Sequence, residues 1–198
     1  MNIIKTAFEV SEEGDRIMIT FPDIYSFYYV SKWLSENVGE IFWILWTDAA
    51  VERINYLGKK YGFPIDGEAL VIGSNKECTY LRCIERADIY SDLQRLMKSL
   101  PLERRVIVVF GIDFLEVYGY HISKVVELLV EHEKGVLVTS LLKKPPEELL
   151  PFHDMIIEIV KSEDSYIAYH SYIAKLVFSM KGGVTEASDI FYIGETTN

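Results

Sequence analysis

Three short and almost uninterrupted apolar runs constrain the fold of this chain most strongly. They are EIFWILWT at residues 40–47, RVIVVFGI at 105–112 and GVLVTSL at 135–141. A strand that is apolar on both sides needs cover on both faces, which is typical of central parallel strands between two layers of helices. The runs therefore predict an α/β protein in which helices cover both faces of a sheet.

Helical patterns separate these runs along the chain. The predicted helices span residues 25–38, 49–61, 89–100 and 120–133. Two further strands are expected, at 16–21 and 69–73, and a less regular connector that holds both cysteines is expected at 74–88. This alternation of strands and helices predicts a mostly parallel, doubly wound sheet.

The pattern changes after residue 150. Four segments there read as consecutive strands without helices between them, at 155–160, 166–170, 173–180 and 189–194. Strands in direct succession favour antiparallel pairing, so we expect the parallel sheet to be extended by antiparallel C-terminal strands. Residues 1–198 are predicted to form one domain, and the structure of the N-terminal segment, 1–14, is left open.

Composition and charge restrict the partners of the chain. It has 198 residues, of which 49% are hydrophobic and 25% charged, as is typical of a globular domain. Its net charge of -10 argues against general binding of nucleic acid, which needs a basic surface. No apolar run approaches the roughly 20 residues that span a bilayer, and no signal-peptide pattern is present. We expect a cytoplasmic protein that binds neither membranes nor nucleic acid.

The connection after the first predicted strand lies where many nucleotide-binding α/β proteins hold phosphate. A P-loop has the form G-x-x-x-x-G-K-[ST], because glycines let backbone amides wrap the phosphate and the lysine neutralises its charge. Placed on residues 20–27, this pattern puts Thr20 and Tyr25 at the glycines and Ser26 at the lysine. A shift by one residue also supplies neither Gly nor Lys. ATP binding through a P-loop is therefore not expected.

The helix that follows carries an unusual number of aromatic side chains. Its inward stripe is predicted to be Phe27, Val30 and Leu34, by helical periodicity. Four aromatic residues fall beside or opposite that stripe: Tyr25, Tyr28, Tyr29 and Trp33. Tyr and Trp are enriched at protein interfaces because they bury a large area and keep a polar group. These four are the predicted interface residues, and packing in the core is the alternative.

The order of these elements and their strand-end residues resembles the RecA-like ATPase core, and most closely its KaiC-like branch. GDRIMITFPDIYSFYYVSKWL stands where that family has a strand, the P-loop and the first helix. EIFWILWTDAAVERI is similar to its second strand and catalytic-acid turn, RVIVVFGIDFLEVYG to its Walker B strand, GVLVTSLL to its sensor strand, and KLVFSMKGGVTEASDIFYIGE to its late strands and basic turn. The resemblance covers residues 14–194. It implies a three-layer RecA-like fold, and the chain looks like the small archaeal proteins of unknown function in this branch.

The resemblance also gives positions to five residues at strand ends or turns. Asp48 falls near the family's catalytic glutamates, and Asp113 matches the acid that holds the metal ion. Thr139 and Ser140 match the polar sensor position, and Lys181 falls in the turn that carries phosphate-contacting basic residues. Without a P-loop we expect these residues to be relics, with Asp48 acting as a helix N-cap and Asp113 as a structural strand-end residue.

Other kinds of site find little support in the sequence. None of the four histidines forms a close ligand pair with another His or Cys, so no metal is expected. Cys78 and Cys83 have a spacing that is a poor metal signature, and they read as two thiols in or beside a loop, with a disulfide as the alternative for a hyperthermophilic source. No G-x-S-x-G elbow or G-x-G-x-x-G fingerprint is present, so neither a serine nucleophile nor a dinucleotide cofactor is predicted.

The sequence therefore predicts a RecA/KaiC-like module that has no catalytic activity and needs no cofactor. It would bind a protein or peptide, assemble into a homo-oligomer, or pair with an intact ATPase paralogue. The rival hypothesis is an enzyme or sensor that holds a nucleotide or small anion at a reshaped strand-end site, using Asp48 and Asp113 with Thr139 and Lys181.

Overall fold

The structure is a computed structural model, and it describes residues 1–61, 67–130, 132–162, 170–183 and 188–193. The helices and strands in chain order are α1 (Asn2–Glu9), β1 (Arg16–Thr20), α2 (Ile24–Asn37), β2 (Ile41–Trp46), α3 (Thr47–Tyr61), β3 (Glu68–Ile72), β4 (Arg82–Ala87), α4 (Leu93–Ser99), β5 (Val106–Phe110), η1 (Ile112–Phe114), η2 (Glu116–Tyr118), α5 (Ser123–Val130), β6 (Val136–Leu141), η3 (Glu147–Phe152), β7 (Met155–Lys161), β8 (His170–Ser179) and β9 (Ser188–Ile193).

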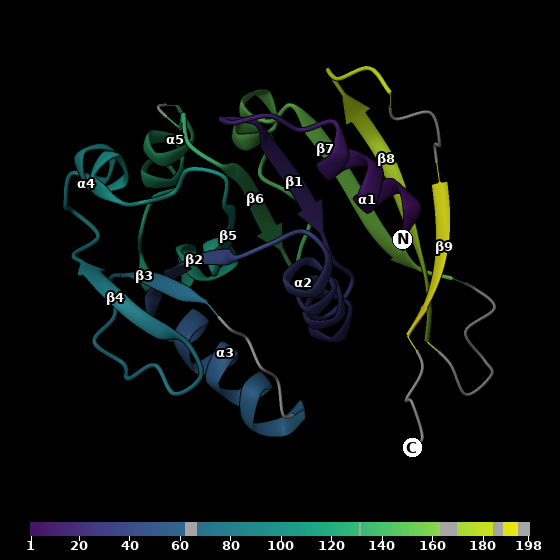
Figure 1. Cartoon of the computed structure of the whole chain (residues 1–198). Coiled ribbons are helices and arrows are strands. Elements are labelled where there is room, and N and C mark those ends of the chain that lie inside the picture. The colour runs from purple at the N-terminus through teal and green to yellow at the C-terminus, as the bar shows by residue number, and fades with distance from the viewer. Residues whose placement is uncertain (62–66, 131, 163–169, 184–187, 194–198) are drawn as a thin grey trace.

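One sheet of nine strands organises the molecule (Figure 1). Its strand order is β4-β3-β2-β5-β6-β1-β7-β8-β9. In this order, every pair of neighbours from β4 across the sheet to β7 is parallel. The last two pairs, β7 with β8 and β8 with β9, are antiparallel. The predicted fold class is confirmed. One detail differs: β7, the first of the consecutive C-terminal strands, still runs parallel to β1.

Helices cover the two faces of the sheet and produce two separate hydrophobic cores. The first core joins one face of the sheet to α1, α2 and α3, and the second joins the other face to α4, α5 and η3. β2 shows why its sequence is apolar throughout, since Trp43 points into the first core and Trp46 into the second, and all six of its residues are buried. This is the three-layer arrangement that the apolar runs predict.

Several elements differ from their predicted bounds. The N-terminal segment contains the helix α1, and its Ile3, Ile4 and Ala7 are buried against the sheet. The connector at 74–88 contains an edge strand, β4, which the sequence pattern did not predict. Of the predicted strand 166–170, only His170 belongs to the described residues, and it is the first residue of β8.

Candidate functional site

The connection between β1 and α2 is short. It consists of Phe21, Pro22 and Asp23 alone, and the backbone N–H of Phe21 still donates to the Leu141 carbonyl, 2.8 Å away, as a continuation of the strand pairing. Asp23 then caps the helix, because its Oδ1 accepts from the backbone N–H of Ser26 at 2.9 Å. A P-loop places about eight residues between strand and helix. The chain here turns directly from one element into the next.

Asp23 also contacts two of the C-terminal strands. Its Oδ2 lies 2.8 Å from Nζ of Lys161 at the end of β7, and the hydroxyl of Tyr172 in β8 donates to both of its oxygens at 3.2–3.3 Å. Burial alone would raise the pKa of Asp23, but the hydrogen bonds from Lys161 and Ser26 hold it below its ordinary value. Burial and the neighbouring Asp23 raise the pKa of Tyr172. The carboxylate therefore ties α2 to the C-terminal strands.

Four phenylalanine side chains occupy the region between the start of α2 and the end of β5. The rings of Phe27 and Phe110 stack with their centroids 4.4 Å apart, and Phe21 meets Phe27 edge-on at 5.5 Å. Phe114 meets Phe110 edge-on at 6.2 Å. We call these four residues the aromatic cluster. Stacked rings at this separation are in contact, so no phosphate group fits between the helix start and the strand end.

The predicted N-cap role of Asp48 is wrong. The helix α3 begins at Thr47, so Asp48 lies in its first turn, where a carboxylate still complements the helix dipole. Its Oδ1 accepts from the hydroxyl of Ser74, 2.5 Å away. Thr47 itself has a φ of 69° and is fully buried, and its hydroxyl has no hydrogen-bond partner within the described part of the chain.

Asp113 joins the ends of two neighbouring strands. It follows β5 within the short helix η1, and its Oδ2 accepts from the backbone N–H of Leu142, just beyond β6, at 2.7 Å. The other oxygen, Oδ1, is buried and finds no partner among the described residues. Burial raises the pKa of this carboxyl, and the Leu142 amide opposes that shift. Gly111 makes the turn possible, because its φ is 100° and a Cβ there would lie 2.6 Å from the Trp46 carbonyl oxygen.

Thr139 is hydrogen-bonded to a buried histidine, His153, that the sequence did not single out. Its hydroxyl lies 2.8 Å from Nε2 of His153, and Nδ1 of the same ring lies 2.8 Å from the Leu149 carbonyl oxygen. The carbonyl can only accept, so Nδ1 carries the proton and Nε2 accepts from Thr139. Burial lowers the pKa of His153 to about 4, so the ring is neutral at pH 7. Ser140, the next residue, is also buried, beside Phe110 and Ile19 in the sheet.

Lys181 does not belong with the other strand-end residues. Its Nζ lies 3.0 Å from Glu12 Oε2 and 3.0 Å from Asp15 Oδ2, and Asp15 directly precedes β1. Because β8 runs antiparallel to β7, its carboxyl end lies at the edge where the parallel strands begin. The structure therefore places Lys181 at the amino ends of the parallel strands, whereas Asp48, Asp113 and the aromatic cluster lie at their carboxyl ends.

The predicted interface residues of α2 pack against three different neighbours. Tyr25 and Tyr28 approach the ring of Tyr61, with centroids 5.9 Å and 4.9 Å away, and burial raises the pKa of Tyr28. Tyr29 stacks on Phe191 of β9 at 6.3 Å, and Trp33 lies beside α1 in a shallow groove. All four are half-buried against the first core. They do not form one continuous exposed patch, and their role as an interface stays a prediction.

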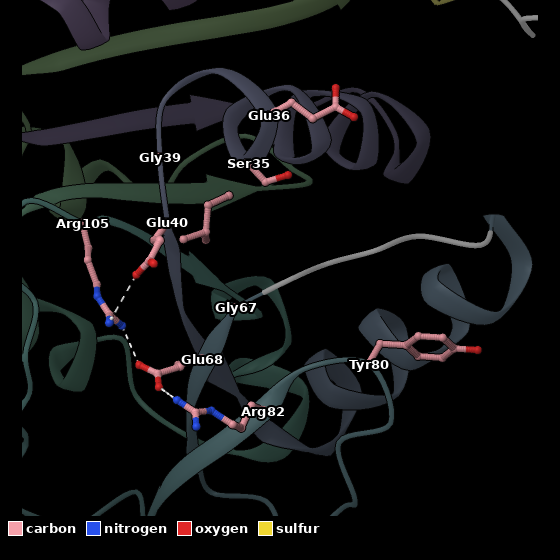
Figure 2. Close-up of a pocket in the computed structure, with 10 residues that line it drawn as sticks. Ser35, Glu36, Gly39, Glu40, Gly67, Glu68, Tyr80, Arg82 and Arg105 are labelled. Carbon is pink, nitrogen blue, oxygen red and sulfur yellow. Dashed lines mark hydrogen bonds and ion pairs between the residues drawn. The ribbon is translucent and has the colours of Figure 1, made fainter.

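A cavity of about 760 Å³ lies at the edge where β2, β3, β4 and β5 begin (Figure 2). Four of its charged groups, Glu40, Glu68, Arg82 and Arg105, are paired within one network. Arg105 donates to Glu68 at 2.6 Å and lies 3.5 Å from Glu40, and Glu68 also pairs with Arg82. The side chains of Arg105 and Glu68 are only 20% and 18% exposed. This compensated network explains the buried charges without a ligand.

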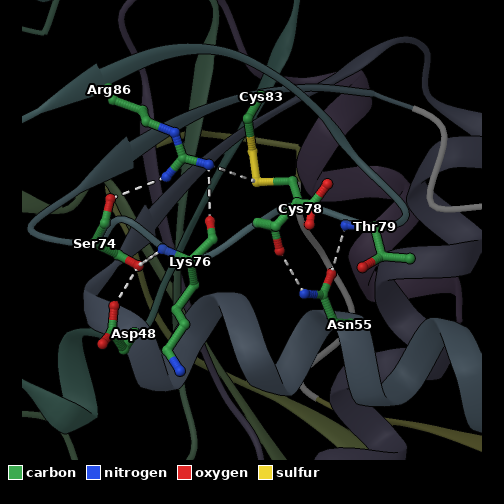
Figure 3. Close-up of a disulfide and its surroundings, with 9 residues drawn as sticks. Asp48, Asn55, Ser74, Lys76, Cys78, Thr79, Cys83 and Arg86 are labelled. Atoms are coloured by element: carbon green, nitrogen blue, oxygen red, sulfur yellow. Dashed lines mark hydrogen bonds between the residues drawn. A yellow bond between two sulfur atoms is a disulfide. The ribbon is translucent and has the colours of Figure 1, made fainter.

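The two cysteines form a disulfide, Cys78–Cys83, so they are not free thiols (Figure 3). It closes a loop that Arg86 and Asn55 also hold. The guanidinium of Arg86 donates to the carbonyls of Ser74 and Lys76 at 3.0 Å and 2.8 Å. The side chain of Asn55 in α3 bonds the backbone on both sides of Cys78. The connector thus fixes β4 to α3 and includes Ser74, the partner of Asp48.

Among the described residues, no helix combines the length and the apolar composition that a membrane span needs. No group of three His, Cys, Asp or Glu side chains in the same part of the chain is placed to hold a metal ion.

Comparison with known proteins gives a sequence relative and several solved structures of similar fold. The chain is 51% identical to an uncharacterized protein of Archaeoglobus fulgidus over 195 residues, which cover 98% of this chain and 100% of that protein. The structure of PH0250 from Pyrococcus horikoshii OT3 aligns with a TM-score of 0.66 at 16% identity, over 100% of both chains. The flagellar accessory protein FlaH from Methanocaldococcus jannaschii aligns with a TM-score of 0.50 at 14% identity, over 96% of this chain and 90% of that one. No family model matches the chain.

The structural neighbours concern the fold alone, since their sequence identities are low. With FlaH as a neighbour and nine strands in this order, the fold is RecA-like. The sequence relative shows the family of this chain, because half of the aligned residues are identical over almost the whole length of both proteins. The chain belongs to the same family as this uncharacterized archaeal protein.

Proposed function

We propose that the protein is a RecA-like module without ATPase activity, which acts by binding another protein chain. The observation that carries this proposal is the aromatic cluster together with the three-residue connection that precedes α2. Phosphate binding in this fold needs backbone amides arranged around an anion and a lysine to neutralise it. Here the amide of Ser26 is engaged by Asp23, and the rings of Phe21 and Phe27 pack beside the start of α2.

Two further observations support a role without nucleotide chemistry. Asp113 and Thr139, which match catalytic positions of the resembling family, each have a structural partner within the fold, Leu142 and His153. Asp48 is bonded to Ser74, and Lys181 lies at the opposite edge of the sheet. A RecA-like domain that has lost its site retains surfaces for assembly, with copies of itself or with an intact paralogue, and we place that role in the cytoplasm.

Isothermal titration with Mg-ATP and Mg-ADP tests the absence of ATPase activity. We expect no binding in the micromolar range or tighter for either nucleotide, because residues 20–27 supply neither the glycines nor the lysine of a phosphate loop. An ATPase assay at high protein concentration should give the same rate as buffer. Saturable binding tighter than micromolar would overturn the proposal.

A second candidate function is a sensor for a small ligand at the strand ends. The observation in its favour is the buried Oδ1 of Asp113, which has no partner among the described residues. Thermal shift measurements with Mg²⁺, phosphate and nucleotides would detect such a ligand. If a shift occurs in the wild type and Asp113→Ala leaves it unchanged, this candidate is excluded. If the shift disappears in the variant, the sensor replaces the binding module as the better account.

A further inference from the structure

Among the described residues, no helix covers one face of the sheet at its C-terminal end. Residues of β8 and β9 such as Tyr172, Ala174 and Phe191 belong to the first core, under α1 and α2, but no residue of these two strands belongs to the second core as described. Cross-strand pairing places Val160, Ile173 and Ile190 in one row on the uncovered face. Ile190 is 55% exposed, and Tyr192, on the same face, is 65% exposed.

Five of the large exposed hydrophobic residues of the described chain lie on β8, β9 or the turn after β8: Val177, Phe178, Met180, Ile190 and Tyr192. Val177, Phe178 and Met180 lie beyond the part of β8 that pairs with β9, whereas Ile190 and Tyr192 belong to β9 itself. Exposed apolar side chains on one strand are typical of a site of association, and β9 offers these two.

The two edges of the sheet are built differently. β4 forms one edge and carries three charged side chains, Arg82, Glu85 and Arg86, and its pairing with β3 is interrupted by an irregularity between Ala69 and Leu70. Charges and bulges at an edge strand are the usual means by which proteins prevent edge-to-edge pairing. The edge at β4 is therefore protected.

β9 forms the other edge, and Figure 1 shows it as the outermost strand. Its sequence, SDIFYI, has strong β propensity and contains one charged residue, Asp189. That carboxylate is only 13% exposed and lies 2.8 Å from the amino group of Met1, which neutralises it. No charged side chain within β9 itself opposes the approach of another strand.

We propose that β9 pairs antiparallel with β9 of a second copy of this chain, so that the sheet continues across a two-fold axis. This inference rests on the proposed function, since it names the partner of the binding module. A two-fold pairing sets the same surface against itself, which requires a surface without uncompensated charge. β9 meets that requirement because the charge of Asp189 is neutralised, whereas β4 presents the charged side chains of Arg82, Glu85 and Arg86. The apolar side chains Ile190 and Tyr192 of both copies then lie side by side.

Sedimentation equilibrium of the full chain, over a series of concentrations, tests the inference. The wild type should be a dimer, and Ile190→Lys should raise its dissociation constant by at least about tenfold, because each copy brings a charge to the new strand pair. Ile84→Lys is the matched control: it places the same charge on the opposite edge strand, at a residue that is 38% exposed. It should leave the dissociation constant unchanged. Circular dichroism establishes that both variants are folded, and Tyr192→Lys takes the place of Ile190→Lys if that variant does not fold.

Three outcomes would overturn the inference. They are a wild type that stays monomeric at the highest concentration, a dimer that Ile190→Lys and Tyr192→Lys leave unchanged, and a dimer that Ile84→Lys weakens as much. None of these outcomes bears on the titration with Mg-ATP, so the proposed absence of ATPase activity stands or fails separately. If the first outcome is accompanied by a complex with a different chain, that chain replaces the second copy as the partner.

Discussion

Single buried side chains explain why the fold persists without its phosphate loop. When the P-loop pattern is placed on residues 20–27, Phe27 stands at the Ser/Thr position, and after a shift by one residue it stands at the lysine. Phe27 is only 1% exposed. It stacks on Phe110 and also meets the ring of Trp43 edge-on at 6.3 Å. At a position where a P-loop would contact phosphate, this residue packs in the hydrophobic core.

Replacing Phe27 should show how much the aromatic cluster stabilises the protein. Phe27→Ala leaves a cavity and should lower the free energy of unfolding by about 3–5 kcal/mol. Phe27→Leu keeps most of the apolar volume and should lower it by roughly 1 kcal/mol, through the lost ring stacking. Urea denaturation measures both, and Tyr90→Ala, at a residue that is 79% exposed, is the control expected to stay within about 0.5 kcal/mol of the wild type. Equal effects of Ala and Leu would contradict a packing role.

His153 should make the stability depend on pH. Its pKa is about 4 in the folded protein, below the ordinary value of 6.5, so the unfolded chain binds more protons between these values. Stability is complete above pH 6.5 and should decrease by roughly 3 kcal/mol as the pH falls to about 4. Urea denaturation across this range measures the slope, and His153→Gln should reduce it. A remaining slope is expected from His132, whose pKa burial also lowers. An identical slope in wild type and variant would show that His153 is not the titrating group.

At the scale of the elements, apolar strands were predicted well and polar ones were missed. β2 and β5 are entirely buried, and their uninterrupted apolar sequences predict this. β4 was missed because an edge strand with the sequence RCIERA is mostly exposed, and it has no apolar pattern to separate it from a loop. The helix α3 begins at Thr47, two residues before the predicted start at Ala49, and Thr47 has a left-handed φ of 69°, which threonine rarely adopts and the sequence does not announce.

The disulfide should contribute to stability by restricting the unfolded chain. Cys78 and Cys83 close a short loop, for which loop entropy gives a contribution of about 2 kcal/mol. A reducing agent should lower the free energy of unfolding of the wild type by this amount. The double variant Cys78→Ser, Cys83→Ser should be less stable to the same degree and should not respond to the reducing agent. A thiol assay under denaturing conditions without reductant should detect no free thiol, and two free thiols would contradict the pairing.

At the scale of the whole molecule, the sequence predicted the fold and the lost motif but not what replaced it. The absence of Gly and Lys in residues 20–27 could be read directly. The aromatic cluster could not, because its four rings come from two segments that only the sheet order brings together. The grouping of Lys181 with Asp113 and Thr139 at the carboxyl ends of the strands was wrong for a related reason. The direction of β8, and not the local sequence of the turn, decides at which edge of the sheet that residue lies.

The three-residue connection between β1 and α2 also limits what substitutions can do to this chain. A phosphate loop of about eight residues cannot be obtained from Phe21, Pro22 and Asp23 by exchanging side chains, because the backbone length itself is missing. It would need an insertion of roughly five residues together with the removal of Phe27 from a packed core. Point mutations alone therefore cannot give this chain a phosphate loop at that connection.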